Sequence, residues 1–323
     1  MKKLVVLMIS IVLILSIASI SSAAVTVNTD FRYEYINISG NDKNQAANGS
    51  QAEAYDNADF RIIVDYAPDT NPKYSGHMQL RTQTTGKPTT EQNYNLNSQL
   101  DFYADEYWIN WQKSWGNIRI GNWDWKITPS RVLVKASGNN IFPRSQSSLA
   151  IDVPLGSVFY TGANYVIDGS SDSKVRDGAY DLKLGFKTQK VGLELHGYDC
   201  NTTSGVETGT AWDLWYQAFD SVKFYVYGHD VEYTNSDPDP ETIFGILFTN
   251  LGGVKGAQIS LEYGIDKTDP IIFTKEYNQY GLQAIYPFAS GWQVEYELTN
   301  LYMKLTSADV ETKHLLRLRL KSK

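Results

Sequence analysis

The segment VTVNTDFRYEYINI, residues 25–38, decides the fold because its side chains alternate between two chemistries. The apolar and aromatic side chains stand at odd positions: Val25, Val27, Phe31, Tyr33 and Tyr35. The even positions carry polar side chains: Thr26, Asn28, Asp30, Arg32 and Glu34. Because successive side chains of a β-strand point to opposite faces, the segment predicts a strand with one apolar and one polar face.

The same period of two recurs along the chain. No segment after residue 24 shows the spacing of an amphipathic helix. Further alternating segments are DFRIIVDY (59–66), GHMQLRTQ (76–83), YDLKLGFK (180–187), VGLELHGY (191–198), VKFYVYGH (222–229) and WQVEYELTN (292–300). The closing segment LLRLRLKSK (315–323) alternates leucine with positive charge, which directs Leu316, Leu318 and Leu320 to one face and Arg317, Arg319 and Lys321 to the other.

Short and long connections alternate between these segments. The short ones contain turn-forming residues and fall at 68–72, 114–117, 154–157, 188–190, 220–221, 252–256 and 287–291. The long polar ones fall at 39–56, 84–98, 122–146, 168–177, 200–210, 234–241, 266–274 and 303–310. With SLAIDV (148–153) and VFYTGANYVI (158–167) as two strands around the Pro154 turn, seven short and eight long connections join sixteen strands.

An even number of strands places both ends of the chain at the same rim. The first strand can then pair with the last and leave no open edge. An open sheet of this size would twist and expose two edges, so we expect an all-β, antiparallel up-and-down barrel.

The expected size of the barrel predicts which face is wet. Sixteen strands enclose a space too wide for side chains to fill, so the polar faces should line water and the apolar faces should meet membrane lipid. Aromatic residues beside the short turns would then form a row at the membrane interface: Tyr66, Tyr74, Trp111, Tyr286 and Trp292.

The N-terminal segment predicts export. Lys2 and Lys3 precede an apolar run that ends at Ser22-Ala23-Ala24, so we expect residues 1–24 to be a cleaved signal peptide and residues 25–323 to form a single barrel domain. The formal net charge of −7 does not favour nucleic acid as a partner. The lone Cys200 excludes an internal disulfide framework and a cysteine-rich zinc site.

No pattern predicts an enzyme, a metal site or a cofactor. His77, His196, His229 and His314 lie on separate segments, without the H-E-x-x-H or G-x-S-x-G spacing. An outer-membrane hydrolase whose Ser and His meet only in space is left open. The segment NSDPDPE (235–241) lacks the glycine and spacing of an EF-hand loop, so we expect a solvated loop there.

The chain resembles the general bacterial porins of Gram-negative outer membranes. The most specific segment is SWGNIRIGNWDW (114–125), which is similar to that family's short turn, strand and glycine before the third long loop. The resemblance implies a sixteen-stranded barrel in outer-membrane lipid, assembly as a homotrimer and passive diffusion of small hydrophilic solutes and ions. It also implies that the third long loop, residues 122–146, folds inward to form a constriction.

The chain departs from the family pattern at two places. The constriction loop of the family is usually acidic, whereas here Asp124 is outnumbered by Lys126, Arg131, Lys135 and Arg144. The final residue is Lys323, where the family usually has an aromatic residue. The first departure suggests an altered ion preference.

Charged residues of the polar faces predict a polarised lumen. The basic residues expected to line it are Arg32, Arg61, Arg81, Arg119, Arg317 and Arg319, which barrel closure would bring together. The acidic residues expected on the far side are Glu194, Asp213, Glu262, Glu295 and Glu297, interrupted by Lys183, Lys187 and Lys223. Basic residues on both wall and loop predict a mild anion preference.

Two alternatives remain open on the sequence. Inward aromatic residues could stack on sugar rings and make the channel sugar-selective: Tyr198, Trp215, Tyr225 and Tyr227. The abundance of tyrosine and tryptophan is also compatible with a secreted β-rich carbohydrate-binding protein, for example a sandwich.

Overall fold

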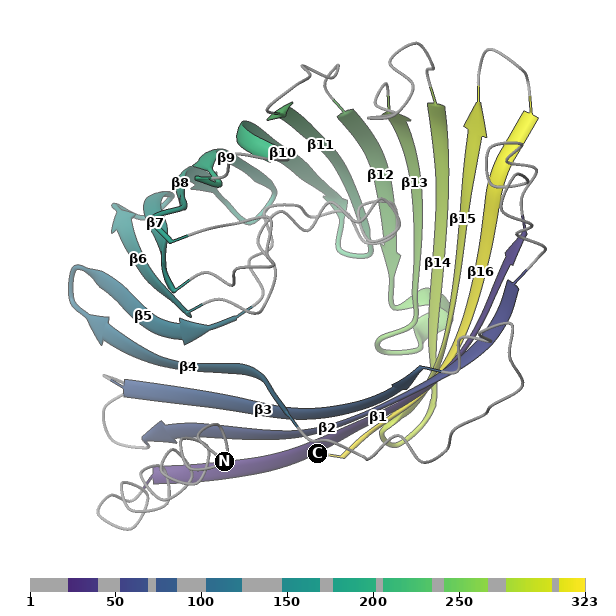
Figure 1. The fold of residues 1–323 in the computed structure, drawn as a ribbon, viewed down its shortest axis with the longest axis horizontal. Coiled ribbons are helices and arrows are strands. Elements are labelled where there is room, and N and C mark those ends of the chain that lie inside the picture. The colour runs from purple at the N-terminus through teal and green to yellow at the C-terminus, as the bar shows by residue number, and fades with distance from the viewer. Residues whose placement is uncertain are drawn as a thin grey trace.

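The computed structural model is a closed barrel of sixteen antiparallel strands (Figure 1). It describes residues 23–39, 53–68, 74–85, 103–123, 147–168, 177–201, 206–233, 241–266, 277–303 and 308–322. Within these ranges no helix is long and apolar enough to cross a membrane. The predicted fold class is confirmed, and the closed barrel excludes the alternative of a carbohydrate-binding sandwich.

Each strand pairs with its sequence neighbours, as an up-and-down meander requires. The strands are β1 (Ala23–Ser39), β2 (Glu53–Pro68), β3 (Tyr74–Thr85), β4 (Tyr103–Lys113), β5 (Gly116–Asn122), β6 (Ser147–Leu155), β7 (Phe159–Asp168), β8 (Tyr180–Lys187), β9 (Val191–Asp199), β10 (Val206–Phe219), β11 (Val222–Tyr233), β12 (Glu241–Thr249), β13 (Gln258–Asp266), β14 (Tyr277–Ala289), β15 (Trp292–Met303) and β16 (Ala308–Lys321). A short 3-10 helix, η2 (Leu251–Gly253), lies between β12 and β13.

All seven predicted short connections join the expected strands, but the strands extend into several of them. Pro154 lies inside β6, Gly116 and Asn117 lie inside β5, and Pro287 lies inside β14. β2, β10 and β16 begin before the predicted ends of the loops that precede them, at Glu53, Val206 and Ala308. These extensions have no clear alternation in sequence and are held by pairing with the adjacent strand.

The barrel closes where β1 pairs with β16. Their register places Tyr33 opposite Leu318 and Glu34 opposite Arg317. Outward-facing residues therefore meet outward-facing residues across the seam, and charged residues meet charged residues. The predicted pairing of the first and last strands is confirmed.

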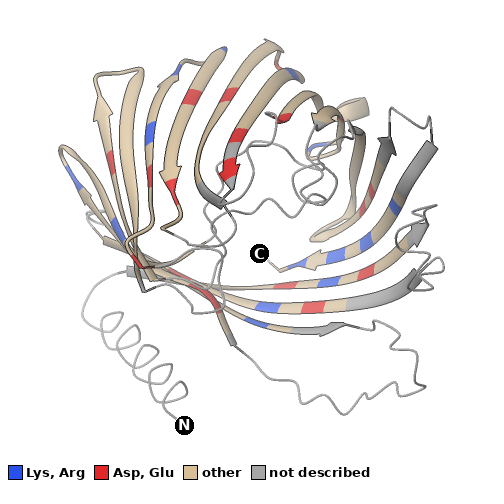
Figure 2. Ribbon diagram, turned by 45° about the horizontal axis from the view of Figure 1, so that its top comes forward, with Lys and Arg blue, Asp and Glu red and all other residues tan. Residues whose placement is uncertain are grey.

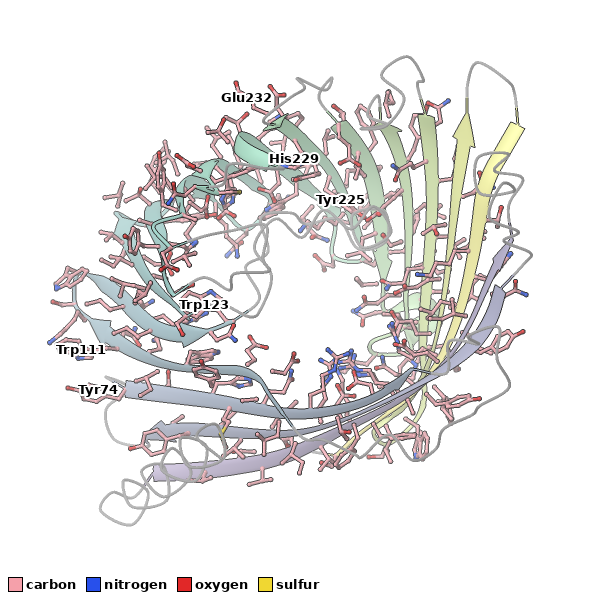
Figure 3. All side chains as sticks on the ribbon, viewed as in Figure 1. Tyr74, Trp111, Trp123, Tyr225, His229 and Glu232 are labelled. Carbon is pink, nitrogen blue, oxygen red and sulfur yellow. The ribbon has the colours of Figure 1, made fainter. Side chains whose placement is uncertain are left out.

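The two faces of the wall follow the predicted alternation. On β1, Phe31, Tyr33 and Tyr35 are exposed, whereas Asp30 and Glu34 are buried. Figure 3 shows the same separation elsewhere, with the labelled Tyr74 and Trp111 outside the wall and Trp123 and Tyr225 toward its interior. Charged residues form bands along many of the strands (Figure 2). The polar side is thus the inner side.

The outer face carries aliphatic residues between two aromatic rows. From the long-loop end to the short-turn end, the outward residues are Tyr107, Ile109 and Trp111 on β4; Tyr180, Leu182, Leu184 and Phe186 on β8; and Tyr280, Leu282, Ala284 and Tyr286 on β14. The predicted row at the short turns is confirmed, with Tyr74 stacked on Trp111 at 6.0 Å between ring centroids. The second row at the long-loop end was not predicted. Two aromatic rows around an apolar band are typical of transmembrane barrels.

Aromatic rings lie across glycines of the adjacent strand at several places in the wall. Tyr160 covers Gly185, Tyr198 covers Gly209, Trp212 covers Gly228, Trp215 covers Gly192, and Tyr225 covers Gly245. A Cβ atom built on Gly245 would lie 2.1 Å from Cζ of Tyr225, so only glycine accepts this ring position. The ring in turn covers a backbone that has no side chain of its own.

The contact at Gly245 generates a stability prediction. Replacing Gly245 with Ala forces the Tyr225 ring to move and breaks its hydrogen bond to Glu262. We expect Gly245→Ala to lower the free energy of unfolding by about 1–3 kcal/mol, the usual cost of overpacking. Urea unfolding of the refolded barrel in detergent, followed by tryptophan fluorescence, measures this change.

The matched control is Gly197→Ala, because a Cβ atom built on Gly197 meets no atom within 4 Å. This variant should be as stable as the parent protein or gain about 0.5 kcal/mol, since alanine restricts the unfolded chain more than glycine does. Equal destabilisation by the two substitutions would contradict the ring-over-glycine account.

Candidate functional site

Ion pairs cross the seam on the inner face of β16 and β1. Arg317 Nε donates to Glu34 Oε1 at 2.5 Å, and Arg317 Nη1 donates to Glu295 Oε2 on β15 at 2.6 Å. Arg319 Nε donates to Asp30 Oδ1 at 2.7 Å. Arg32 also donates to Asp30, with Nη2 2.7 Å from Oδ2. The two ends of the chain are therefore joined by side chains as well as by the backbone ladder.

The ionic network continues on β2, β3 and β4. Asp59 accepts hydrogen bonds from Arg61 Nε at 2.9 Å and from Arg81 Nε at 2.9 Å. Asp105 lies 3.7 Å from Arg81 and accepts a 2.6 Å bond from the Gln79 amide. Five of the six predicted basic residues thus come together on neighbouring strands, as closure implied. Figure 3 shows a dense group of nitrogen atoms over the inner face of this wall.

Acidic side chains lie beneath these five arginines, called the arginine layer below: Arg32, Arg61, Arg81, Arg317 and Arg319. The side chains of Arg32, Arg81 and Arg319 are 17–18% exposed, whereas those of Asp30 and Asp59 are 3% exposed. At Asp30 and Asp59, three of the four paired guanidinium groups are therefore much more exposed than the carboxylate that they share. The sequence analysis did not identify these acids as site residues, although Asp30/Arg32 and Asp59/Arg61 at spacing i, i+2 on one strand face are a visible signal.

The predicted separation of acidic and basic walls is wrong for Glu295 and Glu297. Glu295 bonds Arg317, and Glu297 lies 3.7 Å from the same guanidinium. Both also accept hydrogen bonds from Gln283, at 2.7 and 2.8 Å. The cross-strand register β15–β16 brings them next to the arginines, which strand parity alone does not reveal.

Arg119 does not belong to the arginine layer. It lies on β5, and its Cζ atom is 4.4 Å from the ring centroid of Trp108 and 5.6 Å from that of Trp123. The ring of His77 stacks on the Trp108 ring at 5.4 Å between centroids. The expectation that all six arginines form one group is therefore wrong at this position.

The other predicted acids lie on the wall formed by β8 to β13. Glu194 Oε1 is 2.8 Å from His196 Nε2, and Asp181 Oδ1 is 3.0 Å from His196 Nδ1, so two carboxylates hold the imidazole. Tyr160 donates to Glu194 at 2.6 Å, and Asp213 pairs with Glu194 across the β9–β10 ladder.

Two further pairs complete this wall. Lys183 Nζ lies 2.7 Å from Asp152 Oδ1, so the lysine that interrupts the acidic wall is itself paired. Glu262 accepts a 2.5 Å hydrogen bond from Tyr225 and is 4% exposed. The wall opposite the arginine layer is therefore mixed in charge, with several of its carboxylates engaged by neighbouring side chains.

The predicted sugar path is wrong for three of its four aromatic rings, which are not available for stacking. Tyr198, Tyr225 and Tyr227 are only 2–4% exposed. Tyr198 bonds His229, and both Tyr198 and Tyr227 belong to an inward-facing apolar cluster that includes Ile243. Trp215 is partly exposed, and Lys223 Nζ lies 4.6 Å from its ring centroid.

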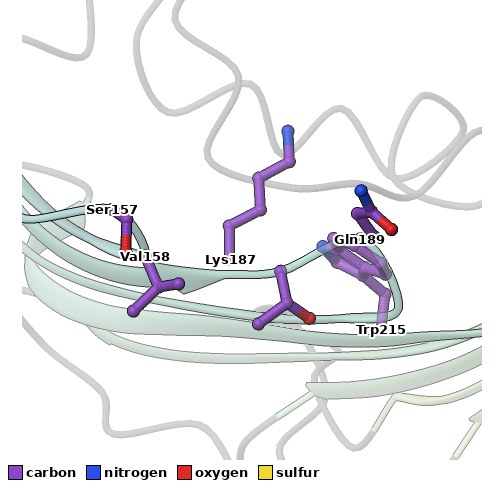
Figure 4. A pocket seen from close by; sticks show the side chains of 6 residues that line it. Ser157, Val158, Lys187, Gln189 and Trp215 are labelled. Atoms are coloured by element: carbon purple, nitrogen blue, oxygen red, sulfur yellow. The ribbon is translucent and has the colours of Figure 1, made fainter.

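An open pocket of about 600 Å³ lies at the rim formed by the short turns (Figure 4). Ser157, Val158, Lys187, Thr188, Gln189 and Trp215 line it. Figure 4 shows Lys187 extending from the wall near Gln189 and Trp215. The pocket places one cationic and several polar groups at the short-turn mouth of the barrel.

The residues predicted for the constriction loop, Asp124, Lys126, Arg131, Lys135 and Arg144, lie outside the described residues. Within the described ranges, no group of three or more His, Cys, Asp or Glu is arranged to hold a metal ion. Each of the four histidines bonds a carboxylate or a tyrosine there, and none of them bonds a serine. Burial raises the pKa of the Cys200 thiol to about 12, so the thiol stays protonated.

No family model matches the sequence, and no curated protein matches it. Solved structures do match the fold. The anion-selective porin from Comamonas acidovorans superposes with a TM-score of 0.62 at 12% identity, covering 93% of this chain and all of that one. A substituted porin of Rh. blastica gives 0.61 at 11% identity, with 93% and 100% coverage.

A loop-deletion mutant of OmpT, an outer membrane protein of Vibrio cholerae, gives a TM-score of 0.62 at 12% identity, covering 94% of this chain and all of that one. These identities are too low to transfer an activity, but the coverage includes nearly the whole barrel. The chain therefore has the fold of the bacterial porins.

Proposed function

We propose that this protein is an outer-membrane channel for passive diffusion of small hydrophilic solutes and ions. The observation that carries the proposal is the distribution of charge in a closed sixteen-stranded wall, with a layer of arginines and acids facing inward and an apolar band facing outward. A barrel of this width encloses water, and paired charges with a guanidinium surface are stable only where water reaches them.

The outer surface supports a membrane location. Aliphatic side chains between two aromatic rows match a hydrocarbon layer bounded by two interfaces. The predicted signal segment, residues 1–24, would direct export and be removed after Ala24. Assembly as a homotrimer, implied by the family resemblance, is part of the proposal.

The channel should prefer anions mildly. The guanidinium groups of Arg32, Arg81 and Arg319 are more exposed than Asp30 and Asp59, so an ion that passes these pairs meets positive charge first. The preference is mild because Asp30, Asp59 and Glu34 compensate most of that charge. The Comamonas structure, whose name records anion selectivity, is a fold relative of this barrel. We assign the chain no catalytic step.

Conductance in planar bilayers tests the channel directly. The purified protein should fractionate with outer membranes, require detergent and produce stepwise ohmic currents in KCl. Under a KCl gradient, the reversal potential should have the sign of a weak anion preference. Absence of channel steps would reject the channel, and clear cation selectivity would reject the ion preference alone.

Neutralising Arg81 should shift the ion preference. Arg81→Gln removes one exposed guanidinium and leaves Asp59 bonded to Arg61 and Asp105 bonded to Gln79. We expect the anion-to-cation permeability ratio to fall about twofold, a change of the size that one charge produces near water. Reversal potentials in the same salt gradient measure it.

The matched control is Lys113→Gln, which removes one positive charge from the outer face, where Lys113 Nζ lies 3.6 Å from the Trp111 ring centroid. This variant should leave the reversal potential unchanged. An equal shift in both variants would mean that total charge, and not the inner wall, sets the preference.

A further inference from the structure

Arg119 is held by aromatic faces and not by an acid. Its guanidinium carbon lies 4.4 Å from the ring centroid of Trp108 and 5.6 Å from that of Trp123. His77 extends the stack on the far side of Trp108, with 12° between the two ring planes. Its own bond to Asp65, at 2.7 Å from Nδ1 to Oδ1, fixes the imidazole in place. The stack is therefore anchored at both ends, by the β2 carboxylate and by Trp123 at the end of β5.

Among the described residues, Arg119 differs from every other inner-wall arginine. Each of the others has a carboxylate within hydrogen-bond distance: Arg32 and Arg319 on Asp30, Arg61 and Arg81 on Asp59, and Arg317 on Glu34 and Glu295. Arg119 has no ion pair with any described residue, and its buried Nε has no hydrogen-bond partner. Asp152 and Glu106 act on it only through longer-range attraction.

A guanidinium group that lacks a carboxylate partner can bind the carboxylate of a solute. Arginine binds a carboxylate best in its own plane, through two parallel N–H donors. Arg119 is partly exposed although its Nε is buried, so the accessible part of the side chain can meet a solute.

We propose that Arg119, on the ring face of Trp108, forms a binding subsite for planar carboxylates whose charged group is conjugated to an aromatic ring. Such a ring lies in the plane of its carboxylate and therefore continues the plane of the guanidinium. The Trp108 ring that lies against the guanidinium can then contact the solute ring as well. A saturated ring is thicker, and a tetrahedral phosphate cannot keep all its oxygens in that plane.

This inference deepens the proposed function, because the open barrel supplies the route to the subsite. The subsite would select one class of anion, whereas the arginine layer would favour anions in general. The paired guanidiniums of that layer already have carboxylate partners, so a solute carboxylate would have to displace Asp30 or Asp59 there. At Arg119 nothing among the described residues has to be displaced.

The first experiment measures binding without using conductance. Saturation-transfer NMR on the detergent-solubilised protein is recorded with sodium benzoate, with cyclohexanecarboxylate as an anion of similar size that is not flat, and with benzamide as a flat neutral molecule. Benzoate should show transfer and saturate, and the other two should bind at least about tenfold more weakly. Equal binding of benzoate and cyclohexanecarboxylate would overturn the proposal.

The second experiment compares Arg119→Lys with Arg81→Lys. Both variants keep the positive charge, but lysine has neither the planar fork nor a flat face to stack. Benzoate should reduce the single-channel chloride current of the parent protein saturably, with a half-blocking concentration about tenfold higher in Arg119→Lys and unchanged in Arg81→Lys. An unchanged value in Arg119→Lys would overturn the proposal.

The two readouts separate the subsite from the channel. Normal chloride conductance without benzoate binding would overturn the subsite and leave the proposed function standing. Benzoate binding in detergent without any channel steps would overturn the proposed function and leave the subsite standing.

Discussion

Closure of the sheet is the constraint on which the rest of the structure depends. In a hydrocarbon layer every backbone N–H and C=O must find a partner inside the protein, so a sheet can span it only without edges. The β1–β16 ladder removes the last two edges, and the Arg317–Glu34 and Arg319–Asp30 pairs join the same two strands from the inside. The charged inner face and the apolar outer face are both consequences, because closure with sixteen strands makes one side wet and the other dry.

On the inner wall, arginine side chains lie over or beside buried carboxylates. Isolated carboxylates in the wall would be costly to bury, and Asp30, Asp59 and Glu34 are each satisfied by an arginine. Asp30 and Asp59 each serve two guanidiniums, which holds four arginines in fixed positions without leaving a bare acid at the surface. The layer is nearly neutral in total but positive where water meets it. This arrangement explains how an acidic protein can present a basic surface to a solute.

Aromatic residues have three different roles in this wall. On the outside, Tyr and Trp mark the two interfaces of the apolar band. Inside, Tyr198 and Tyr225 lie flat over glycines of the adjacent strands and hydrogen-bond inner-wall partners, so they belong to the wall and not to a path for sugars. Trp108 and Trp123 hold Arg119 without neutralising it. Residue type alone does not distinguish these roles, because each depends on the neighbour across the strand.

The sequence by itself determined the strands, their number, the pairing of the first with the last, and which face of each is polar. Alternation with a period of two and the spacing of turns are local properties of the sequence, so they can be recognised before the fold is known. Only the tertiary structure decided which charges meet. Glu295 and Glu297 stand beside Arg317 and not across from it, and Arg119 stands apart from the other arginines, because cross-strand register and side-chain direction set these contacts. The odd or even position of a residue in its strand predicts the face on which its side chain lies. A contact also depends on which residue of the adjacent strand lies opposite and how far away it is, and pairing of all strands in the closed barrel sets both.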